Sequence, residues 1–407
     1  MRTLMQFGRR GAAVCFACLL ALFGNGVAAG VEYKQQPVTL GDGVVRQATV
    51  PAGYVLEFLT ELDGPRLPTF AGNGDLLIGS TSGRIYRFAP PYTRAEVLVT
   101  LDGYPHSVAQ RDGELLIART DGLYRAPYQP GQKVIDPHTV TLQAALPGGG
   151  GHSSRTVRIG PDGRVYVSLG ISRNCSDQYL GLPYPFEGRR GGVLVLVEGG
   201  ARPHFEPYAS GLRNPVGFDW QPGTGAMYAS NNGPDHLGYD QPPEYFSRLD
   251  PGSFHGMPWF QYDGRQLRRD ACIKSTPPRP AGDVVLPVAT FPARIAPLGV
   301  AFVPPGALDP EFTGDAIVAL HGSWATWQSG NPATRRPPGL VRVRFRDGVA
   351  QGVEVLVSGF QLGNGDRWVR PAGIAFGPDG ALYFTSDGGD TQGLFRLRRE
   401  SPTVESR

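Results

Sequence analysis

Lysine is the scarcest charged residue of this 407-residue sequence, occurring only at Lys34, Lys133 and Lys274. Nearly all positive charge is therefore arginine, and this scarcity disfavours chemistry that needs a lysine Schiff base. Two common signatures are also missing. The sequence has no Gly-x-Gly-x-x-Gly dinucleotide fingerprint between a strand and a helix, and no phosphate-binding loop with its lysine.

The formal net charge at pH 7 is +3, and Arg2, Arg9 and Arg10 near the N-terminus account for all of it. The rest of the chain is neutral, which excludes a basic surface for nucleic acid or for membranes. After these arginines come an apolar run over 11–23 and the small residues of 27–29. This pattern predicts a signal peptide over 1–29, a single mature domain over 30–407, and a periplasmic or secreted protein. A retained N-terminal anchor is the alternative. No later apolar stretch is long enough to span a membrane, so no membrane span is expected after cleavage.

Cysteine is rare in the predicted mature chain, where only Cys175 and Cys272 remain. Cys15 and Cys18 belong to the signal region, and no histidine follows Cys18 as haem attachment requires. An exported protein is free to oxidise its thiols. A disulfide between Cys175 and Cys272 and a pair of free thiols both remain open.

Long amphipathic helices are not visible, whereas the 57 glycines and 38 prolines indicate many short strands joined by tight turns. A turn-and-strand unit recurs, most clearly over 156–169 and 373–385, which both turn at Gly-Pro-Asp-Gly. Asp-Gly and Asn-Gly tips require positive φ angles and are typical of hairpins. Four similar units turn near residues 74, 112, 224 and 314.

Six such units predict an all-β fold, a six-bladed β-propeller with loop insertions on one face. A β-sandwich is the competing architecture, but a sandwich domain needs far fewer residues. The segment 50–62 is expected to close the ring against the last blade. The longest irregular segments, 172–190 and 235–280, are expected to build a pocket.

In a propeller, the loops before the innermost strands open onto one face of the central channel. Residues at these positions are rich in arginine and histidine: Arg66, His106, His152 to Arg155, Arg213, Asn214, Pro297 and Arg370. Because like charges repel at a channel mouth, we expect an anionic or oxygen-rich ligand there. Pairing with surface acids is the alternative for each arginine taken singly.

Two segments carry candidate chemistry. His152 follows four glycines, which let the backbone approach a ligand closely, and an imidazole there suits general-base catalysis. The stretch Asn231-Asn232-Gly233-Pro234-Asp235 follows a predicted strand. Its carbonyl groups and the nearby acids Asp240 and Glu244 are plausible ligands for Ca²⁺, although no EF-hand spacing is present.

Taken together, these stretches resemble the quinoprotein glucose/sorbosone dehydrogenase family, and most of all its L-sorbosone dehydrogenase branch. The resemblance runs in order through most of the chain. Its stretches are Gly-Gly-His152-Ser-Ser-Arg155-Thr, Gly211-Leu-Arg213-Asn214-Pro215, Asn232-Gly233-Pro234-Asp235, Ala319-Leu-His321-Gly322-Ser323-Trp324 and Arg370-Pro371.

The resemblance implies a propeller that binds pyrroloquinoline quinone (PQQ) and Ca²⁺ on one face and oxidises a small sugar substrate. It makes His152 the base that takes the sugar hydroxyl proton. It assigns catalysis and cofactor binding to Arg213, and cofactor contacts to a further set: Asn214, Asn232, His321, Trp324 and Arg370. Carbonyl oxygens of Gly233 and Pro234 would ligate the metal. With no haem motif in the chain, the electrons would pass to a separate acceptor, either a protein or a mediator.

The chain also departs from its relatives. His321 stands where the soluble glucose enzymes place a lysine, as in the sorbosone branch. Ile171 stands where those enzymes carry an acid that orients the base, and Ala325 follows Trp324 where an asparagine is usual. Two other functions remain open on the same fold, a non-catalytic binding propeller and a Ca²⁺-dependent lactonase. The lactonase needs several acids or amides at the channel, which the arginine- and histidine-rich ring argues against.

Overall fold

The computed structural model describes residues 31–326 and 330–400, so the predicted signal peptide and Trp327 lie outside the described residues. The chain divides into two units after Glu32, and the strands of the described residues belong to the second unit, Tyr33–Arg407. Within the described ranges, no helix is long and apolar enough to cross a membrane.

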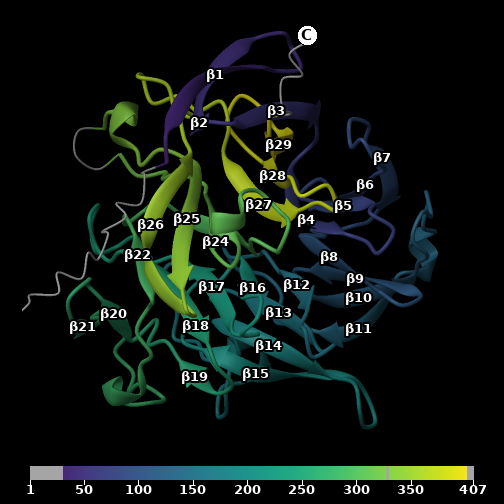
Figure 1. Ribbon diagram of the computed structural model, residues 1–407. Helices are drawn as coiled ribbons and strands as arrows, with labels where there is room; N and C mark the ends of the chain where they lie inside the picture. The colour runs from purple at the N-terminus through teal and green to yellow at the C-terminus, as the bar shows by residue number, and fades with distance from the viewer. Residues whose placement is uncertain (1–30, 327–329, 401–407) are drawn as a thin grey trace, which may run out of the picture. The chain divides into compact units, whose positions relative to one another are not determined.

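Six sheets, antiparallel except for a short parallel strand at the edge of the third, form a six-bladed β-propeller, which confirms the predicted all-β class (Figure 1). The first three sheets are β4 (Pro65–Phe70), β5 (Leu76–Ser80), β6 (Arg84–Phe88) and β7 (Glu96–Thr100); β8 (Ser107–Arg111), β9 (Glu114–Arg119), β10 (Gly122–Pro127) and β11 (Thr141–Ala145); and β12 (Val157–Ile159), β13 (Val165–Leu169), β14 (Gly192–Val197) and β15 (His204–Ser210). The last three are β16 (Phe218–Trp220), β17 (Met227–Asn231), β18 (Glu244–Leu249) and β22 (Ala289–Phe291); β23 (Pro297–Phe302), β24 (Ala316–Leu320), β25 (Gly339–Arg346) and β26 (Val349–Val357); and β27 (Pro371–Phe376), β28 (Leu382–Ser386), β29 (Gly393–Arg399) and β3 (Tyr54–Glu61).

The turn residues produce these hairpins as the sequence predicts. Gly163 and Gly380, at the tips of the two Gly-Pro-Asp-Gly turns, have φ angles of 76° and 75°. Asp162 and Asp379 complete each turn, because each accepts a backbone hydrogen bond two residues on. Such Asx turns fix the geometry between the first and second strand of a blade.

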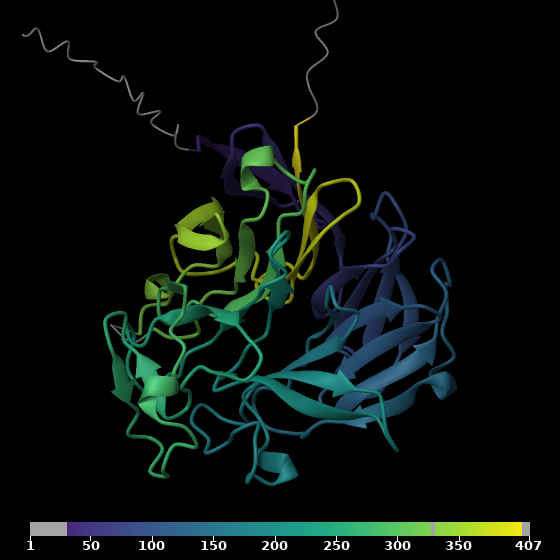
Figure 2. The ribbon, with the colours of Figure 1, turned by 60° about the horizontal axis from the view of Figure 1, so that its bottom comes forward.

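The ring closes through strands from opposite ends of the chain. β3 pairs antiparallel with β29, from Tyr54↔Arg399 to Gly393↔Glu61. This confirms the predicted closure by 50–62. An additional hairpin, β1 (Tyr33–Thr39) with β2 (Val45–Pro51), lies beside this last blade (Figures 1 and 2).

The second predicted insertion is not a single loop, because 235–280 contains β18, the third strand of the fourth blade. Four of the six β18 side chains are buried in a row, from Glu244 to Ser247, so the segment lacks the alternation that marks an exposed strand. The remaining insertion holds β19 (Ser253–Phe254), β20 (Phe260–Tyr262) and β21 (Leu267–Arg269). Single 3₁₀ turns complete the described structure: Pro137–Thr139, Phe186–Gly188, Ala281–Asp283, Pro310–Phe312 and Pro332–Thr334.

The hydrophobic core lies between the blades. One cluster joins Leu116 and Ala118 of β9 to Val165 and Val167 of β13, and comparable clusters fill the spaces between other neighbouring blades. Each sheet therefore has apolar side chains on both faces, which explains the near-continuous apolar runs of the second strands.

The first strands of the blades meet around the axis so closely that certain positions accept only glycine. A Cβ atom on Gly217 would lie 2.2 Å from the Leu298 carbonyl oxygen, and one on Gly299 would lie 2.7 Å from that of Ala372. Gly373 is equally confined. All three glycines end a repeated x-Pro-x-Gly motif. An apolar cluster occupies this centre: Leu67, Val216, Leu298 and Ala372.

Substituting Gly217→Ala is expected to destabilise the propeller, because the new methyl group meets the backbone of β23, which cannot rotate away. Overpacking of this kind costs about 1–3 kcal/mol. Chemical denaturation would measure the loss. Gly199→Ala is the matched control, since a Cβ atom added at Gly199 would have no neighbour within 4 Å. Equal stabilities for the two variants would contradict this account of the central ring.

Candidate functional site

The antiparallel blades bring two kinds of loop to the same face. A first strand begins at the edge where the second strand of its blade ends, so the loop before the first strand lies beside the loop after the second. His152, Arg213 and Arg294 lie on loops of the first kind, before β12, β16 and β23. Asn232 and His321 lie on loops of the second kind, after β17 and β24.

These loops surround a pocket of about 490 Å³, a volume within the usual range for small-molecule sites. Its lining includes seven of the nine predicted site residues, His152, Arg213, Asn214, Asn232, Gly233, His321 and Trp324, together with Arg66 of the predicted ring. Asp235, Glu244, Ser323 and Ala325, which lie in segments that the sequence marks, also line the pocket. Arg294, Ala296 and Leu298 line it as well, and the sequence did not single them out.

His152 is held by a backbone carbonyl. Its Nδ1 lies 2.5 Å from the carbonyl oxygen of Ile171, so Nδ1 carries the proton and Nε2 remains an acceptor. The side chain of Ile171 cannot replace the acid of the glucose enzymes, but its backbone oxygen orients the ring. Burial, aided by the charge of Arg213, lowers the pKa of His152 to about 4. The imidazole is therefore neutral, with a free lone pair, at ordinary pH.

The glycine loop before His152 is fixed by two buried guanidinium groups. Arg155 donates to the carbonyl oxygens of His152, Ser154 and Pro147. Arg190 donates to Pro147 and to Gly149, at 2.8 and 3.1 Å. Arg155, one of the predicted ring arginines, thus shapes the loop and does not line the pocket.

Arg213 is positioned by Asn174. Its Nε donates to the Asn174 carbonyl oxygen at 2.9 Å, and its Nη2 donates to Asn174 Oδ1 at 2.8 Å. The same Oδ1 accepts the amide N–H of Asp235 at 2.8 Å. Asn174 lies in the first predicted insertion, which therefore serves the pocket through Arg213 without lining it.

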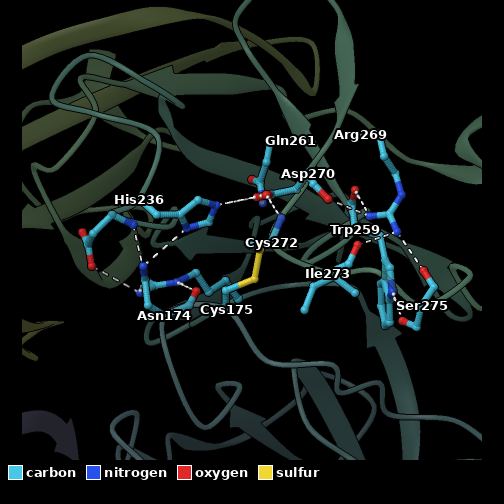
Figure 3. The surroundings of a disulfide bond; sticks show 12 residues. Asn174, Cys175, His236, Trp259, Gln261, Arg269, Asp270, Cys272, Ile273 and Ser275 are labelled. Carbon is cyan, nitrogen blue, oxygen red and sulfur yellow. Dashed lines mark hydrogen bonds and ion pairs between the residues drawn. A yellow bond between two sulfur atoms is a disulfide. The ribbon is translucent and has the colours of Figure 1, made fainter.

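A disulfide anchors this arrangement, as Figure 3 shows. Cys175 is bonded to Cys272, with their Cα atoms 6.4 Å apart, which settles the open cysteine question. On the Cys272 side, Asp270 accepts the Cys272 amide N–H at 2.9 Å and lies 3.0 Å from His236 Nε2. His236 Nδ1 lies 3.4 Å from Asn174 Nδ2. The bond thus ties both insertions together next to Arg213.

Glu244 and Arg294 form a buried pair beneath Gly233. The Glu244 carboxylate accepts the amide N–H groups of Gly233 and Arg294. Burial raises the pKa of Glu244 to about 7. The Arg294 guanidinium donates to the carbonyl oxygen of Pro234, so this predicted metal ligand is hydrogen-bonded to a cation. Asn232 Oδ1 is buried and has no partner among the described residues.

His321 is the centre of a charged chain on the opposite side. Its Nε2 donates to Asp387 Oδ1 at 2.7 Å, and its Nδ1 accepts from Arg370 Nη2 at 2.9 Å. Burial lowers the pKa of His321, so the imidazole is neutral and does not reproduce a lysine charge. Burial would raise the pKa of Asp387, but Arg66 and His321 outweigh it and hold the pKa well below its usual range.

Arg370 supports the pocket from behind. It donates to the carbonyl oxygens of His321 and Gly322, and its guanidinium lies 4.2 Å from the ring centroid of Trp324. Trp324 is 76 % exposed, so one ring face is available to a ligand, whereas Trp259 and Trp368 are fully buried in the core. Trp324 is therefore the one described tryptophan of the pocket lining.

The sequence missed Asn174, Asp387 and Arg294 as site residues. Glu244 stands out only as an acid near the metal stretch, and Asp387 follows β28 as Asn232 follows β17, so its position carried a signal. Asn174 and Arg294 act through contacts with segments that are distant in the sequence. Their residue types alone do not indicate which segments they will contact.

The chain is a β-propeller with an arginine-rich pocket on one face, as in propeller enzymes that bind a small molecule. Comparison with known proteins identifies the family of the chain. Residues 129–396, more than half of the chain, match the family model described as "Glucose / Sorbosone dehydrogenase". The chain belongs to this family. Membership supports an oxidoreductase of the sugar dehydrogenase class on this propeller.

Solved structures share the fold at low identity. The Trichoderma reesei carbohydrate-active enzyme of family AA12 is 18 % identical, with a TM-score of 0.73 over 87 % of this chain and 98 % of that chain. The PQQ domain of pyranose dehydrogenase from Coprinopsis cinerea, in its holo form, is 18 % identical, with a TM-score of 0.67 over 87 % and 97 %. A Borreliella burgdorferi protein described as uncharacterized is 25 % identical over 84 % of this chain and 88 % of its own length.

Removing the disulfide with the double substitution Cys175→Ser and Cys272→Ser is expected to lower the free energy of unfolding by roughly 2–4 kcal/mol, because it closes a loop of 97 residues. Chemical denaturation of both proteins, with and without reducing agent, tests this. Reduction should lower the stability of the wild type to that of the variant and leave the variant unchanged. A variant as stable as the oxidised wild type would contradict the anchoring role.

Proposed function

We propose that this protein is a periplasmic PQQ-dependent dehydrogenase that oxidises an aldose or a sorbosone-like hydroxy-aldehyde. The observation that carries the proposal is the neutral His152, whose free Nε2 lies in a pocket lined by Arg66, Arg213 and Arg294. The neutral imidazole can remove a hydroxyl proton, and the fixed positive charges beside it can bind an anionic cofactor. Membership of the glucose/sorbosone dehydrogenase family supports the same class of reaction.

The donors of the pocket fit PQQ, a flat quinone with three carboxylates. Arg213 makes three hydrogen bonds to protein groups, which leaves further N–H donors of its guanidinium for an anion. Asn214 and Asn232 add amide groups to the lining. Asn232 Oδ1, which lacks a partner among the described residues, is an acceptor and would take an N–H or O–H donor of the ligand. Trp324 offers an exposed ring face on which a flat ligand can stack.

Each residue has a distinct task in this proposal. Arg213 and Asn214 would bind the quinone oxygens, where their donors favour the negative charge that develops in the reaction. Arg370 would hold a carboxylate end, for which a guanidinium is well suited. His321, whose two ring nitrogens are engaged by Asp387 and Arg370, would position Arg370 for this contact. When bound, PQQ supplies a carbon that accepts hydride as the substrate C–OH becomes C=O, a two-electron step that no protein side chain performs.

His152 would accept the hydroxyl proton at Nε2. The Ile171 carbonyl oxygen fixes the tautomer, because Nδ1–H must point toward it. The lowered pKa keeps this base deprotonated at neutral pH, while the backbone hydrogen bond favours the protonated ring that forms during the reaction.

Calcium, the second implied cofactor, does not fit the donor set in its described form. Ca²⁺ requires six to eight oxygen ligands, and the predicted ligands were the carbonyl oxygens of Gly233 and Pro234. The Pro234 oxygen already accepts from Arg294. No step of the proposed chemistry is assigned to calcium.

The partners of the reaction also belong to the proposal. The substrate is a small sugar, and the electrons leave to a separate acceptor, a protein or a diffusible mediator, since the sequence has no haem-attachment motif. The predicted signal peptide over 1–29 supports a periplasmic or secreted location. His321 stands where the sorbosone branch also has a histidine instead of a lysine, and this resemblance supports a hydroxy-aldehyde as one candidate substrate.

Reconstitution tests the proposed function. Protein produced in a host without PQQ is expected to be inactive and to gain dye-reducing activity toward an aldose or sorbosone when PQQ is added. Titration of PQQ against intrinsic tryptophan fluorescence measures binding separately from turnover. Binding without turnover on any sugar would favour a non-catalytic binding propeller, and failure to bind PQQ would reject the proposal.

Substituting His152→Ala is expected to lower kcat by about 10²- to 10⁴-fold, the usual contribution of a general base, with PQQ binding retained. In the PQQ-free wild type, His152 should titrate with a midpoint of about 4, because burial and the charge of Arg213 disfavour the protonated ring, and NMR of the imidazole measures this midpoint. The matched control is His204→Ala, an exposed histidine on β15. A midpoint near 6.5 in the PQQ-free protein, or equal kcat in both variants, would contradict the assignment of His152.

A further inference from the structure

Arg294 occupies a ring of backbone carbonyl groups. Its Nε and Nη2 donate to the Gly238 oxygen at 2.9 and 2.7 Å, and Nη2 also donates to the Gln241 oxygen. Its Nη1 donates to the Pro234 oxygen and, at 3.2 Å, to Asp235 Oδ1. The side chain is only 2 % exposed. A guanidinium has five N–H donors, and these five hydrogen bonds account for all of them.

The backbone around Arg294 adopts an unfavourable conformation to place this side chain. Arg294 and Ala296 both have positive φ angles, 71° and 56°, which non-glycine residues seldom adopt. The buried carboxylate of Glu244 holds the turn by accepting the Arg294 amide N–H at 2.8 Å. Strained residues that line a pocket are typical of functional sites.

The ring of oxygens has the chemistry of a cation site. Buried carbonyl oxygens converging on one point, with carboxylates nearby, are the ligands that hard cations use. Here the converging oxygens of Pro234, Gly238 and Gln241 are satisfied by a side chain of the same chain. The guanidinium therefore stands at the Pro234 carbonyl, where the family resemblance implies a metal ion.

The local charge argues against a second cation. Two guanidinium groups, Arg213 and Arg294, lie near two carboxyl groups, Asp235 and Glu244, so the net charge of the four is zero when Glu244 is ionised and positive when it is protonated. Burial lowers the pKa of Arg213, and the charge of Arg294 acts in the same direction. A divalent ion at Pro234 would lie next to Arg294 in this buried setting, where like charges repel strongly.

We propose that Arg294 is the resident cation of this pocket and takes the place of Ca²⁺, so that the protein binds its quinone without calcium. The identity of the anionic ligand rests on the proposed function, whereas the exclusion of calcium does not. Because the five N–H donors of Arg294 are engaged with the protein, Arg294 acts on the ligand through its charge. Hydrogen bonds to the ligand come from Arg213 and Asn214.

Two measurements test the inference on the full chain. In the first, CaCl₂ is titrated into the PQQ-free protein by calorimetry, and Tm is measured with and without Ca²⁺. In the second, PQQ binding is measured by fluorescence in EDTA and in CaCl₂. The wild type is expected to bind no Ca²⁺, to keep its Tm, and to bind PQQ with the same Kd, within about twofold, under both conditions.

Arg294→Ala is expected to reverse this behaviour. The freed carbonyl oxygens should bind Ca²⁺, which should raise the Tm of the variant and restore a PQQ affinity that falls at least tenfold in EDTA. Arg294→Lys, which retains a positive charge, should keep PQQ binding independent of calcium. Arg268→Ala is the matched control, an exposed arginine on β21, and it should behave as the wild type does.

Ca²⁺ binding to the PQQ-free wild type, or PQQ binding that requires Ca²⁺, would overturn the inference. If the wild type binds no PQQ under either condition, the proposed function fails, while the Ca²⁺ titration still decides the identity of the cation. If Arg294→Ala does not fold, the wild type and Arg294→Lys decide both questions.

Discussion

The site depends on one constraint, the need to bury several guanidinium groups close together at the mouth of the propeller. Burying an unpaired charge is costly, and a guanidinium is weakly hydrated enough to accept carbonyl oxygens as partners. Carboxylates provide part of the compensation, through Asp387 beside Arg66 and Asp235 beside Arg213 and Arg294. Backbone carbonyl oxygens provide most of the rest.

This constraint explains the conformations of the loops. Arg155 and Arg190 draw the glycine loop inward, Arg294 draws together the segment from Pro234 to Gln241, and Arg370 fixes the backbone after His321. In each case the side chain organises a loop that has no regular hydrogen bonding of its own. The blades below need no such help, because the inner strands and the closing β3–β29 pair already form a rigid ring. The loops can therefore differ in length while the pocket stays defined.

The sequence predicted the propeller well because its signals are local. Glycine-containing turns and apolar second strands occur in each blade, and even the closing strand is recognisable as an extra strand before the first repeat. β18 was missed because both of its faces are buried, so it lacks alternation, and it follows a loop rich in proline and glycine. His152, Arg213, Asn214, Asn232 and His321 were found because motifs mark them. Arg294 was not, since its role depends on which carbonyl oxygens converge, and every residue type has a carbonyl group.

The electrostatics of His152 and of the arginines are linked. Burial and the charge of Arg213 both oppose protonation of His152, and together they lower its pKa to about 4. So weak a base is always available but poorly suited to removing a hydroxyl proton, because catalytic bases work best when their pKa is near the operating pH. An anion bound beside Arg213 would offset that positive charge, and the pKa of His152 would then rise toward its ordinary value. The ligand that fills the pocket thus strengthens the base beside it. On this argument, the low pKa belongs to the ligand-free site, and the excess of positive charge that lowers it is the same feature that attracts the anion.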